Sequence, residues 1–317
     1  MKNILVTGGC GFIGSNFINY MLDTYEDINI VNIDRLDYCA NVNNVYHSKR
    51  YQLVITDLNN YTTVKNVLNQ YSIDSIIHFA AQSHVDNSFG NSIQFTRDNV
   101  LGTHTLLECA REYGKIIRFV HISTDEVYGE VDKEHKGCNE KSLLNPTNPY
   151  AATKAAAEFL VRSYYHSFKL PVIITRGNNV YGPRQYPEKL IPRFITQLLK
   201  GEKCPIHGTG ETRRNFIYVE DVSRAVDTIL RKGEINEIYN IGSEYEYSVK
   251  EVLTLLLSYM DIGNNETEVF EYVEDRAFND FRYCIDSSKL ENLGWKKEVN
   301  FIDGLLRTIK WYSNNEI

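Results

Sequence analysis

The chain begins with the stretch Asn3-Ile4-Leu5-Val6-Thr7-Gly8-Gly9-Cys10-Gly11-Phe12-Ile13-Gly14. Its first five residues suit a buried strand, and an amphipathic run follows over residues 12–22. Glycines at positions 8, 11 and 14 permit a tight turn, close approach of the backbone to a pyrophosphate, and close packing of the helix on the strand. The N–H groups and dipole at the start of a helix also attract phosphate. The stretch therefore predicts the strand, turn and helix of a dinucleotide-binding fold.

Short apolar segments alternate with amphipathic ones along the first two-thirds of the 317 residues. The expected strands are residues 3–7, 28–33, 51–55, 75–79, 116–122 and 172–175, and the clearest helices are 12–22 and 62–69. Apolar strands that alternate with helices predict a parallel sheet covered on both faces, with right-handed crossovers. The expected fold class is α/β, with a doubly wound parallel sheet of Rossmann type.

The pattern changes after Arg176. Residues 177–189 are rich in Gly, Pro and Asn, residues 191–200 suit a helix, and residues 204–208 suit a loop. Residues 215–218, a helix over 219–231, and residues 238–241 look like a return to the sheet. We therefore expect residues 1–176 and 215–242 to form the cofactor-binding domain. Residues 177–214 and 243–317 should form a smaller, interleaved C-terminal substrate domain.

Composition narrows the class of protein. A formal net charge of −7 argues against a nucleic-acid-binding or anionic-membrane surface. The N-terminus does not resemble a signal peptide and no apolar run reaches the roughly 18 residues of a membrane span, so a cytoplasmic protein is expected. Six cysteines lack any C-x-x-C spacing and are expected to be free thiols. No His/Cys/Asp spacing indicates a metal site.

Acidic and small residues follow the next strands. Asp34 closes the second strand, where a carboxylate can accept hydrogen bonds from both adenosine ribose hydroxyls. The same charge would repel a 2′-phosphate, so NAD is favoured over NADP; Arg35 weakens that preference without reversing it. Asp57 and Leu58 could border the adenine, and Ala80 and Ala81 leave room for a cofactor. Each of these four residues alone is better explained as ordinary turn chemistry, and only together with Asp34 do they indicate NAD.

Tyr150 and Lys154 indicate chemistry on an alcohol. Asn148 and Pro149 are a good N-cap and first helical residue, and five alanines favour the helix that follows. Tyr150 and Lys154 then lie on one face, four residues apart. A phenol has a pKa of about 10, and a neighbouring ammonium and a nicotinamide cation both favour the phenolate. By itself the pair could be a chance Tyr and a solvated Lys, but behind the glycine motif it predicts catalysis. The predicted cofactor-binding residues are Gly8, Gly11, Phe12, Ile13, Gly14, Asp34, Asp57, Leu58, Ala80, Ala81, Tyr150 and Lys154.

An acid pair, Asp125 and Glu126, follows the fifth strand directly after Thr124. Ligand sites of open parallel sheets gather at the carboxyl ends of the strands. Two neighbouring carboxylates can differ in pKa when one is more desolvated, which provides one acid and one base. Without the Tyr/Lys pair, a polar loop would be the better interpretation.

Four segments together resemble the nucleotide-sugar branch of the extended short-chain dehydrogenase/reductases. They are residues 8–14, Ser123-Thr124-Asp125-Glu126-Val127-Tyr128-Gly129, residues 150–154, and Asn178-Asn179-Val180-Tyr181-Gly182-Pro183. Within that branch the chain is similar, essentially end to end, to the nucleoside-diphosphate-glucose 4,6-dehydratases. The Thr-Asp-Glu segment discriminates, because the related hexose 4-epimerases usually carry Ser-Ser/Thr-x there.

The resemblance implies roles for five catalytic residues. Tyr150, assisted by Lys154, removes the proton of the glucose 4-hydroxyl while NAD accepts the C4 hydride, and Thr124 hydrogen-bonds that oxygen. Glu126 then takes the acidified C5 proton and Asp125 protonates the departing C6 hydroxyl. The hydride finally returns to C6, so the NAD is regenerated in each turnover.

The resemblance also implies substrate-binding residues and a nucleotide. The implied residues are Ser83, His84, Asn179, Lys189, Leu190, Pro205, His207, Arg214, Asn215 and Arg276. Taken singly, each could be a surface or turn residue, although Arg suits a diphosphate. Where many bacterial thymidine-nucleotide enzymes have Gly-His-Asp, this chain has Phe278-Asn279-Asp280. That segment is closer to the UDP-glucose dehydratase domain of plant rhamnose synthases and to animal dTDP-glucose dehydratase-like proteins, which favours a UDP sugar.

Two rival hypotheses remain open, and a homodimer is expected. The rival chemistry is that of a 4-epimerase or of a dehydratase for another hexose, and the rival class is a catalytically silent NAD-sensing protein. Family members pair through helices that here would begin near Asn91 and Pro149, so a homodimer is expected. The apolar faces that suit such a contact, or equally the sheet, are Leu101, Leu106, Leu107 and Ala110, and Phe159, Leu160 and Tyr164.

Overall fold

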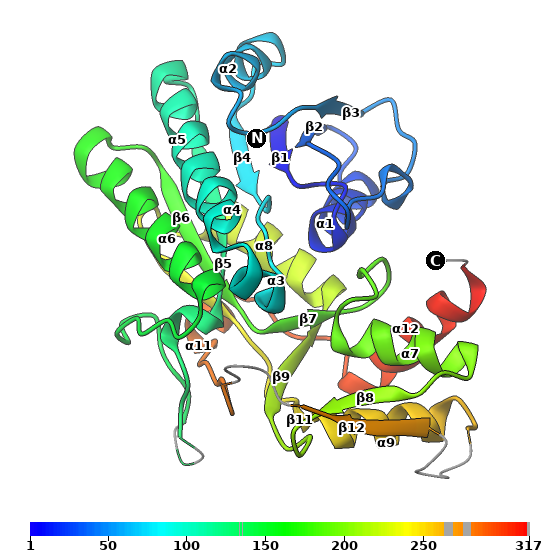
Figure 1. The fold of residues 1–317 in the computed structure, drawn as a ribbon. Coiled ribbons are helices and arrows are strands. Elements are labelled where there is room, and N and C mark those ends of the chain that lie inside the picture. Colours follow the sequence, from blue (N-terminus) through cyan, green and yellow to red (C-terminus); the bar gives the residue numbers. More distant parts are fainter. Residues whose placement is uncertain (133, 135, 263–268, 275–279, 316–317) are drawn as a thin grey trace.

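A seven-stranded parallel sheet forms the centre of the larger part of the molecule (Figure 1). The structure is a computed structural model that describes residues 1–132, 134, 136–262, 269–274 and 280–315. The strand order is β10-β6-β5-β4-β1-β2-β3, and all the pairings are parallel. The strands are β1 (Asn3–Thr7), β2 (Asn29–Asp34), β3 (Tyr51–Ile55), β4 (Ser75–His78), β5 (Arg118–Thr124), β6 (Val172–Gly177) and β10 (Ile238–Ile241).

Helices cover both faces of this sheet. On one face lie α1 (Phe12–Thr24), α8 (Val219–Lys232) and α11 (Ser288–Glu291); on the other lie α2 (Tyr61–Gln70), α5 (Gly102–Tyr113) and α6 (Pro149–Phe168). Successive residues of β1 alternate between the two cores: Ile4 and Val6 pack on one face and Leu5 on the other. The doubly wound α/β prediction is therefore confirmed.

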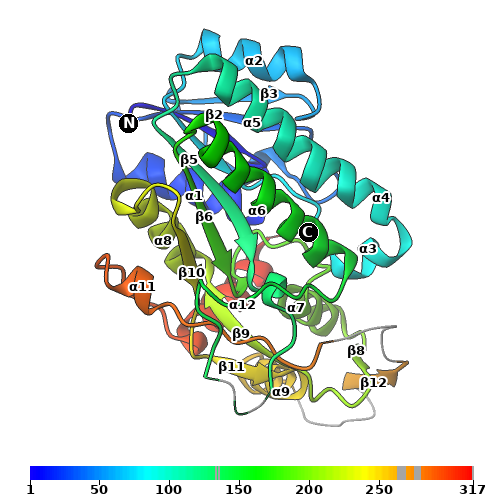
Figure 2. The ribbon, with the colours of Figure 1, turned by 90° about the vertical axis from the view of Figure 1, so that its left-hand side faces the viewer.

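A smaller lobe lies beyond the carboxyl ends of the strands (Figures 1 and 2). It contains a sheet of β7 (Asn179–Tyr181), β9 (Arg213–Tyr218) and β11 (Glu246–Ser248), and the pair β8 (Cys204–His207) and β12 (Phe270–Val273). Its helices are α7 (Leu190–Lys200), α9 (Val249–Tyr259) and α12 (Phe301–Asn314). Tyr181, Phe216 and Phe301 pack together in its core.

Two sequence-based expectations about this lobe were wrong. Residues 215–218 do not return to the main sheet: β9 pairs with β7 and β11, because Phe216 and Tyr218 find their apolar partners in the lobe core. Residues 204–207 are a strand and not a loop, and the buried Cys204 and Ile206 alternate with less buried neighbours. The division into two interleaved domains remains a proposal.

Short helices follow strands β2, β4 and β5 of the main sheet. They are η1 (Val42–Asn44), α3 (Val85–Gly90), α4 (Ser92–Phe95) and η3 (Asp125–Tyr128), while Thr96–Leu101, labelled η2, forms a π-helical turn between α4 and α5. All six cysteines are free thiols, as predicted. Among the described helices, none combines the length and apolarity needed to cross a bilayer.

Candidate active site

A cavity of about 330 Å³ lies at the carboxyl ends of the main strands. The predicted cofactor residues that line it are Gly8, Gly11, Phe12, Ile13, Gly14, Asp34, Asp57, Leu58, Ala80, Ala81, Tyr150 and Lys154, and the remaining predicted catalytic residues Thr124, Asp125 and Glu126 line it too. The fold thus gathers residues from six separate segments at one edge of the sheet, where parallel α/β proteins bind ligands.

The glycine turn fits a dinucleotide. Gly8 has a φ of +72°, and a Cβ there would lie 2.7 Å from the Cα of Ala80. A Cβ on Gly14 would lie 2.5 Å from the Gly8 carbonyl oxygen, so helix α1 could not start this close to the strand with any other residue. No side chain caps the start of α1 and no acidic residue lies in its first turn. The N–H groups there are oriented for a phosphate.

Asp34 lies where an adenosine ribose would be recognised. It ends β2, is buried, and accepts hydrogen bonds from the backbone N–H groups of Cys10 (2.9 Å) and Leu36 (2.8 Å). These two bonds orient the carboxylate toward the cavity that it lines. Each oxygen keeps a second lone pair for a hydroxyl donor.

Asp125 is a buried carboxyl held by an amide of fixed orientation. The Asn178 Oδ1 accepts the Ser243 N–H at 2.9 Å, so the Asn178 Nδ2 must face Asp125, to which it donates at 2.7 Å. Burial raises the pKa of Asp125 to about 7; the Asn178 bond opposes this rise, and the charge of Glu126 adds to it. At neutral pH this carboxyl can carry a proton to donate.

Glu126 is held in the same way by a different amide. The Asn148 Oδ1 caps helix α6 by accepting the Ala151 N–H at 2.8 Å, so the Asn148 Nδ2 donates to Glu126 at 3.1 Å. Burial raises the pKa of Glu126, and the bond from Asn148 and the nearby charge of Arg214 oppose the rise. Two acids with separate supports can therefore take different protonation states.

Tyr150 and Lys154 occupy one face of α6, as predicted. Burial and the charge of Glu126 raise the pKa of the Tyr150 phenol, while the Thr124 hydroxyl lowers it. Burial lowers the pKa of Lys154 to about 8, although the Glu158 carboxylate opposes this. The Lys154 ammonium donates to the Ile122 carbonyl at 2.6 Å, which anchors it beside the end of β5.

The predicted substrate residues are not all placed alike. Ser83, Asn179 and Lys189 line the cavity, and Lys189 donates to the Ser83 carbonyl at 2.7 Å. Leu190 begins α7 next to Lys189. Arg214 lies close enough to lower the pKa values of both Asp125 and Glu126.

The other predicted substrate residues lie away from the cavity lining. His84 is the N-cap of α3 and accepts the Asn87 N–H, and Asn215 donates to the Ser243 carbonyl at 2.8 Å. Pro205 and His207 belong to β8. Arg276 lies outside the described residues.

Sequence reasoning missed the two amides that hold the acids. Asn148 was identified only as a helix cap and Asn178 only as part of a motif. One signal could have found Asn178: it directly follows β6, so it must share the sheet edge with the residues that end β5. Asn148 carries no such signal, because a capping role already explains it.

Comparison with known proteins now identifies the family. The family model described as GDP-mannose 4,6 dehydratase matches residues 5–308. The chain belongs to this family. Its fold and cavity are therefore those of a GDP-mannose 4,6 dehydratase family member, and the predicted relationship to the nucleotide-sugar dehydratases is confirmed.

Curated relatives of this family member cover nearly the whole chain. A trifunctional UDP-glucose 4,6-dehydratase/UDP-4-keto-6-deoxy-D-glucose 3,5-epimerase/UDP-4-keto-L-rhamnose-reductase of Arabidopsis thaliana is 49% identical over 99% of the chain, which spans only 48% of that relative. A dTDP-D-glucose 4,6-dehydratase of Mus musculus is 47% identical over 99% of the chain and 89% of its own length.

Solved structures share the fold. A dTDP-glucose 4,6-dehydratase of Streptomyces venezuelae, solved with NAD bound, is 40% identical with a TM-score of 0.94, covering 99% of this chain and 97% of its own. A UDP-glucose 4-epimerase of Thermus thermophilus is 29% identical with a TM-score of 0.91, covering 98% and 99%. The fold is thus common to dehydratases and epimerases, and the side chains in the cavity must distinguish them.

Proposed function

We propose that this protein is an NAD-dependent dehydratase that converts an NDP-glucose, either UDP-glucose or dTDP-glucose, to the NDP-4-keto-6-deoxyglucose. One observation carries the proposal: the buried Asp125 and the partly buried Glu126, each held by its own amide, share a cavity with Tyr150 and Lys154. An epimerase or an NAD-sensing protein needs no such pair of acids. The product would be an early intermediate of rhamnose or other deoxysugar synthesis.

The side chains suit distinct steps of this reaction. Bound NAD would accept a hydride from C4 and return it to C6. Tyr150 deprotonates the 4-hydroxyl with the assistance of Lys154, and Thr124 hydrogen-bonds the same oxygen. The C4 ketone acidifies the C5 proton, which Glu126 removes as a general base. The protonated Glu126 returns a proton to C5 when the hydride adds to C6, so that one water is lost overall. Asp125, whose pKa of about 7 leaves it partly protonated at neutral pH, donates its proton to the departing C6 hydroxyl.

For the nucleotide we propose that UDP-glucose is accepted at least as well as dTDP-glucose. The support is the Phe278-Asn279-Asp280 segment, which lies partly outside the described residues, and the similarity to a plant UDP-glucose dehydratase. A thymine methyl group is worth about 1–3 kcal/mol in a fitted pocket, so one residue could reverse the order. Competition of the two substrates, compared by kcat/KM, decides the question.

A homodimer is also proposed, through η2, α5 and α6, which lie side by side (Figures 1 and 2). Leu106, Leu107, Ala110 and Tyr164 are buried against the sheet and cannot contribute, whereas Leu101 is 51% and Phe159 60% exposed. These exposed side chains support a helical contact between copies. Light scattering at micromolar concentration should give a dimer, which Phe159→Glu should dissociate; a monomeric unmutated protein would refute the contact.

A cytoplasmic location is consistent with the six free thiols, since proteins of oxidising compartments more often carry disulfides.

The decisive experiment for function incubates the purified protein and NAD with UDP-glucose or dTDP-glucose. A dehydratase forms a 4-keto product that is visible in alkali. An epimerase instead yields the galactose isomer, and an NAD-sensing protein leaves the sugar unchanged.

A further inference from the structure

Arg35 is the residue that could oppose NAD selectivity. It follows Asp34 at the end of β2 and lines the same cavity. In dinucleotide-binding folds, an Arg near this position can accommodate the 2′-phosphate of NADP. Its environment therefore decides whether its charge is available to a phosphate.

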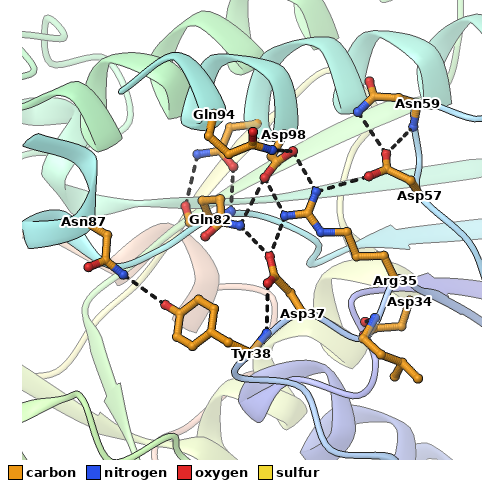
Figure 3. Close-up of polar contacts among 12 residues, drawn as sticks. Asp34, Arg35, Asp37, Tyr38, Asp57, Asn59, Gln82, Asn87, Gln94 and Asp98 are labelled. Atoms are coloured by element: carbon orange, nitrogen blue, oxygen red, sulfur yellow. Dashed lines mark hydrogen bonds and ion pairs between the residues drawn. The ribbon is translucent and has the colours of Figure 1, made fainter. Parts of the chain in front are cut away.

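Three carboxylates surround the Arg35 guanidinium (Figure 3). Its Nη1 donates to Asp57 at 3.1 Å and to Asp98 at 2.8 Å, and its Nη2 donates to Asp98 at 2.6 Å and to Asp37 at 2.5 Å. The contact with Asp98 is bidentate, which is the strongest geometry for this pair. We call Arg35 with Asp37, Asp57 and Asp98 the arginine cage.

Asp98 is the most buried member of the arginine cage. Its side chain is 7% exposed, against 38% for Asp37 and 42% for Asp57. The π-helical turn η2 presents it, and such turns are rare and frequent at functional sites. Gln82 (3.1 Å) and Gln94 (2.8 Å) both donate to its carboxylate, which fixes the orientation of the acceptor.

The same turn anchors the neighbouring cavity wall. Asn99, the residue after Asp98, accepts the Gln82 N–H at 2.7 Å and donates to the Gln82 carbonyl at 3.0 Å. It also donates to the Thr153 hydroxyl at 3.0 Å, one residue before Lys154. The turn that supplies Asp98 is therefore tied to the cavity wall and to helix α6.

The net charge around Arg35 also disfavours a 2′-phosphate. Three carboxylates contact the Arg35 guanidinium and a fourth, Asp34, lines the same cavity, so this region carries a net negative charge despite the presence of Arg35. A 2′-phosphate adds about two negative charges and would be repelled, whereas ribose hydroxyls are neutral donors. Because its charge is already paired with carboxylates, Arg35 is compatible with binding of NAD, which has no 2′-phosphate.

We propose that Asp37, Asp57 and Asp98 withhold Arg35 from the cofactor's 2′ position, so that Arg35 does not act as a phosphate ligand. The proposal rests on the NAD binding proposed above. It assigns cofactor selectivity to the arginine cage together with Asp34, and to the π-helical turn that supplies Asp98.

The test measures binding of NAD⁺ and NADP⁺ by isothermal titration calorimetry, with no turnover required. The reference variant is Asp34→Ser, which removes the carboxylate nearest the ribose. The opened-cage variant adds Asp57→Asn and Asp98→Asn, leaving Arg35 only the exposed Asp37. The matched control adds Glu188→Gln to the reference, because Glu188 also lines the cavity but bonds to Tyr38.

The opened-cage variant should bind NADP⁺ about tenfold more tightly than the reference, whereas the Glu188→Gln control should gain about threefold or less. Arg35→Gln should then cost about tenfold in the opened-cage variant and about threefold or less in the reference. A gain of NADP⁺ affinity cannot result from misfolding. If the opened-cage variant binds neither cofactor, the smaller change Asp34→Ser with Asp98→Asn should show the same direction of gain.

Two results would overturn the proposal: no gain beyond that of the control, or a gain that persists without Arg35. If either result is obtained while the unmutated protein still binds NAD⁺, only the proposed role of the arginine cage is wrong. An unmutated protein that binds NADP⁺ as well as NAD⁺ contradicts the cofactor assignment itself. The proposed dehydration stands or falls separately, because no sugar enters the measurement.

Discussion

The two amides that hold the acids should control opposite limbs of the pH–rate profile. If Asp125 acts as the acid, dehydration is lost as pH rises through its pKa of about 7. If Glu126 acts as the base, dehydration is lost as pH falls through its raised pKa. Each amide N–H stabilises the charged carboxylate, so its removal raises the pKa of the acid that it holds. Asn178→Ser should therefore move the alkaline limb upward, and Asn148→Ser should move the acidic limb upward.

The expected size follows from one hydrogen bond to a charged group. Such a bond is worth about 1.5 kcal/mol or more, and 1.36 kcal/mol corresponds to about one pH unit. One unit above the original pKa, the protonated fraction of Asp125 would rise from about one-tenth to about one-half. We divide the rate of each protein by its own maximum rate. At this pH the relative rate of Asn178→Ser should be about fivefold higher than that of the unmutated protein.

Serine is the matched replacement at both positions. It keeps a side-chain oxygen as an acceptor at both positions, and at position 148, the N-cap of α6, it is itself a good N-cap. It lacks the amide donor that reaches the carboxylate. The measurement is the rate of 4-keto product formation across pH at saturating substrate. Any limb set by Lys154, whose pKa is lowered to about 8, should be common to all three proteins.

If Asn178→Ser moves the acidic limb and Asn148→Ser moves the alkaline limb, the acid and base roles of Asp125 and Glu126 are reversed. If both variants keep the limbs of the unmutated protein, Asp125 and Glu126 do not govern the profile. The dehydratase mechanism derived from them would then be wrong.

Three further outcomes are expected. Tyr150→Phe should abolish reduction of bound NAD by the sugar. Glu126→Gln should permit reduction but lose exchange of the C5 proton with solvent deuterium, at a cost of about 10²–10⁴-fold in overall rate; near-normal dehydration by the Gln variant would show that Glu126 is not the base. Asp34→Ala should weaken NAD⁺ binding and relax discrimination against NADP⁺, and equal turnover of the unmutated protein with both cofactors would contradict this. Glu158→Ala leaves the buried Arg176 guanidinium without its ion-pair partner and should cost about 3–5 kcal/mol in urea unfolding, most of which Glu158→Leu with Arg176→Met should recover.

Local sequence was sufficient to predict the main sheet and the residues that end its strands. The glycine turn, Asp34, the acid pair and the Tyr150/Lys154 helix were predicted from the sequence as site residues, and all of them line one cavity. Each signal is short-range: an apolar strand is followed at once by its polar residue, and parallel strands bring those residues to a common edge. The parallel, doubly wound character of the main sheet therefore follows from the alternation of strands and helices.

The partner of a strand cannot be predicted in this way. β9 has the apolar pattern of a main-sheet strand, yet it pairs in the lobe, because Phe216 and Tyr218 pack with residues that lie far along the chain. The same is true of β8, whose short segment becomes a strand only beside β12. Such pairings depend on which distant surfaces are available for burial.

The sequence by itself therefore determined the fold class and which residues gather at one edge of the sheet, while the catalytic roles of those residues remain predictions. Only the tertiary structure decided how those groups are tuned. Asn178 and Asn148 fix the two acids because Ser243 and Ala151 orient their amides, and Arg35 is held by three carboxylates that lie 2, 22 and 63 residues away. The reason is physical: pKa values and the availability of a charge depend on burial and on neighbours within a few ångströms, and chain folding alone makes distant residues neighbours.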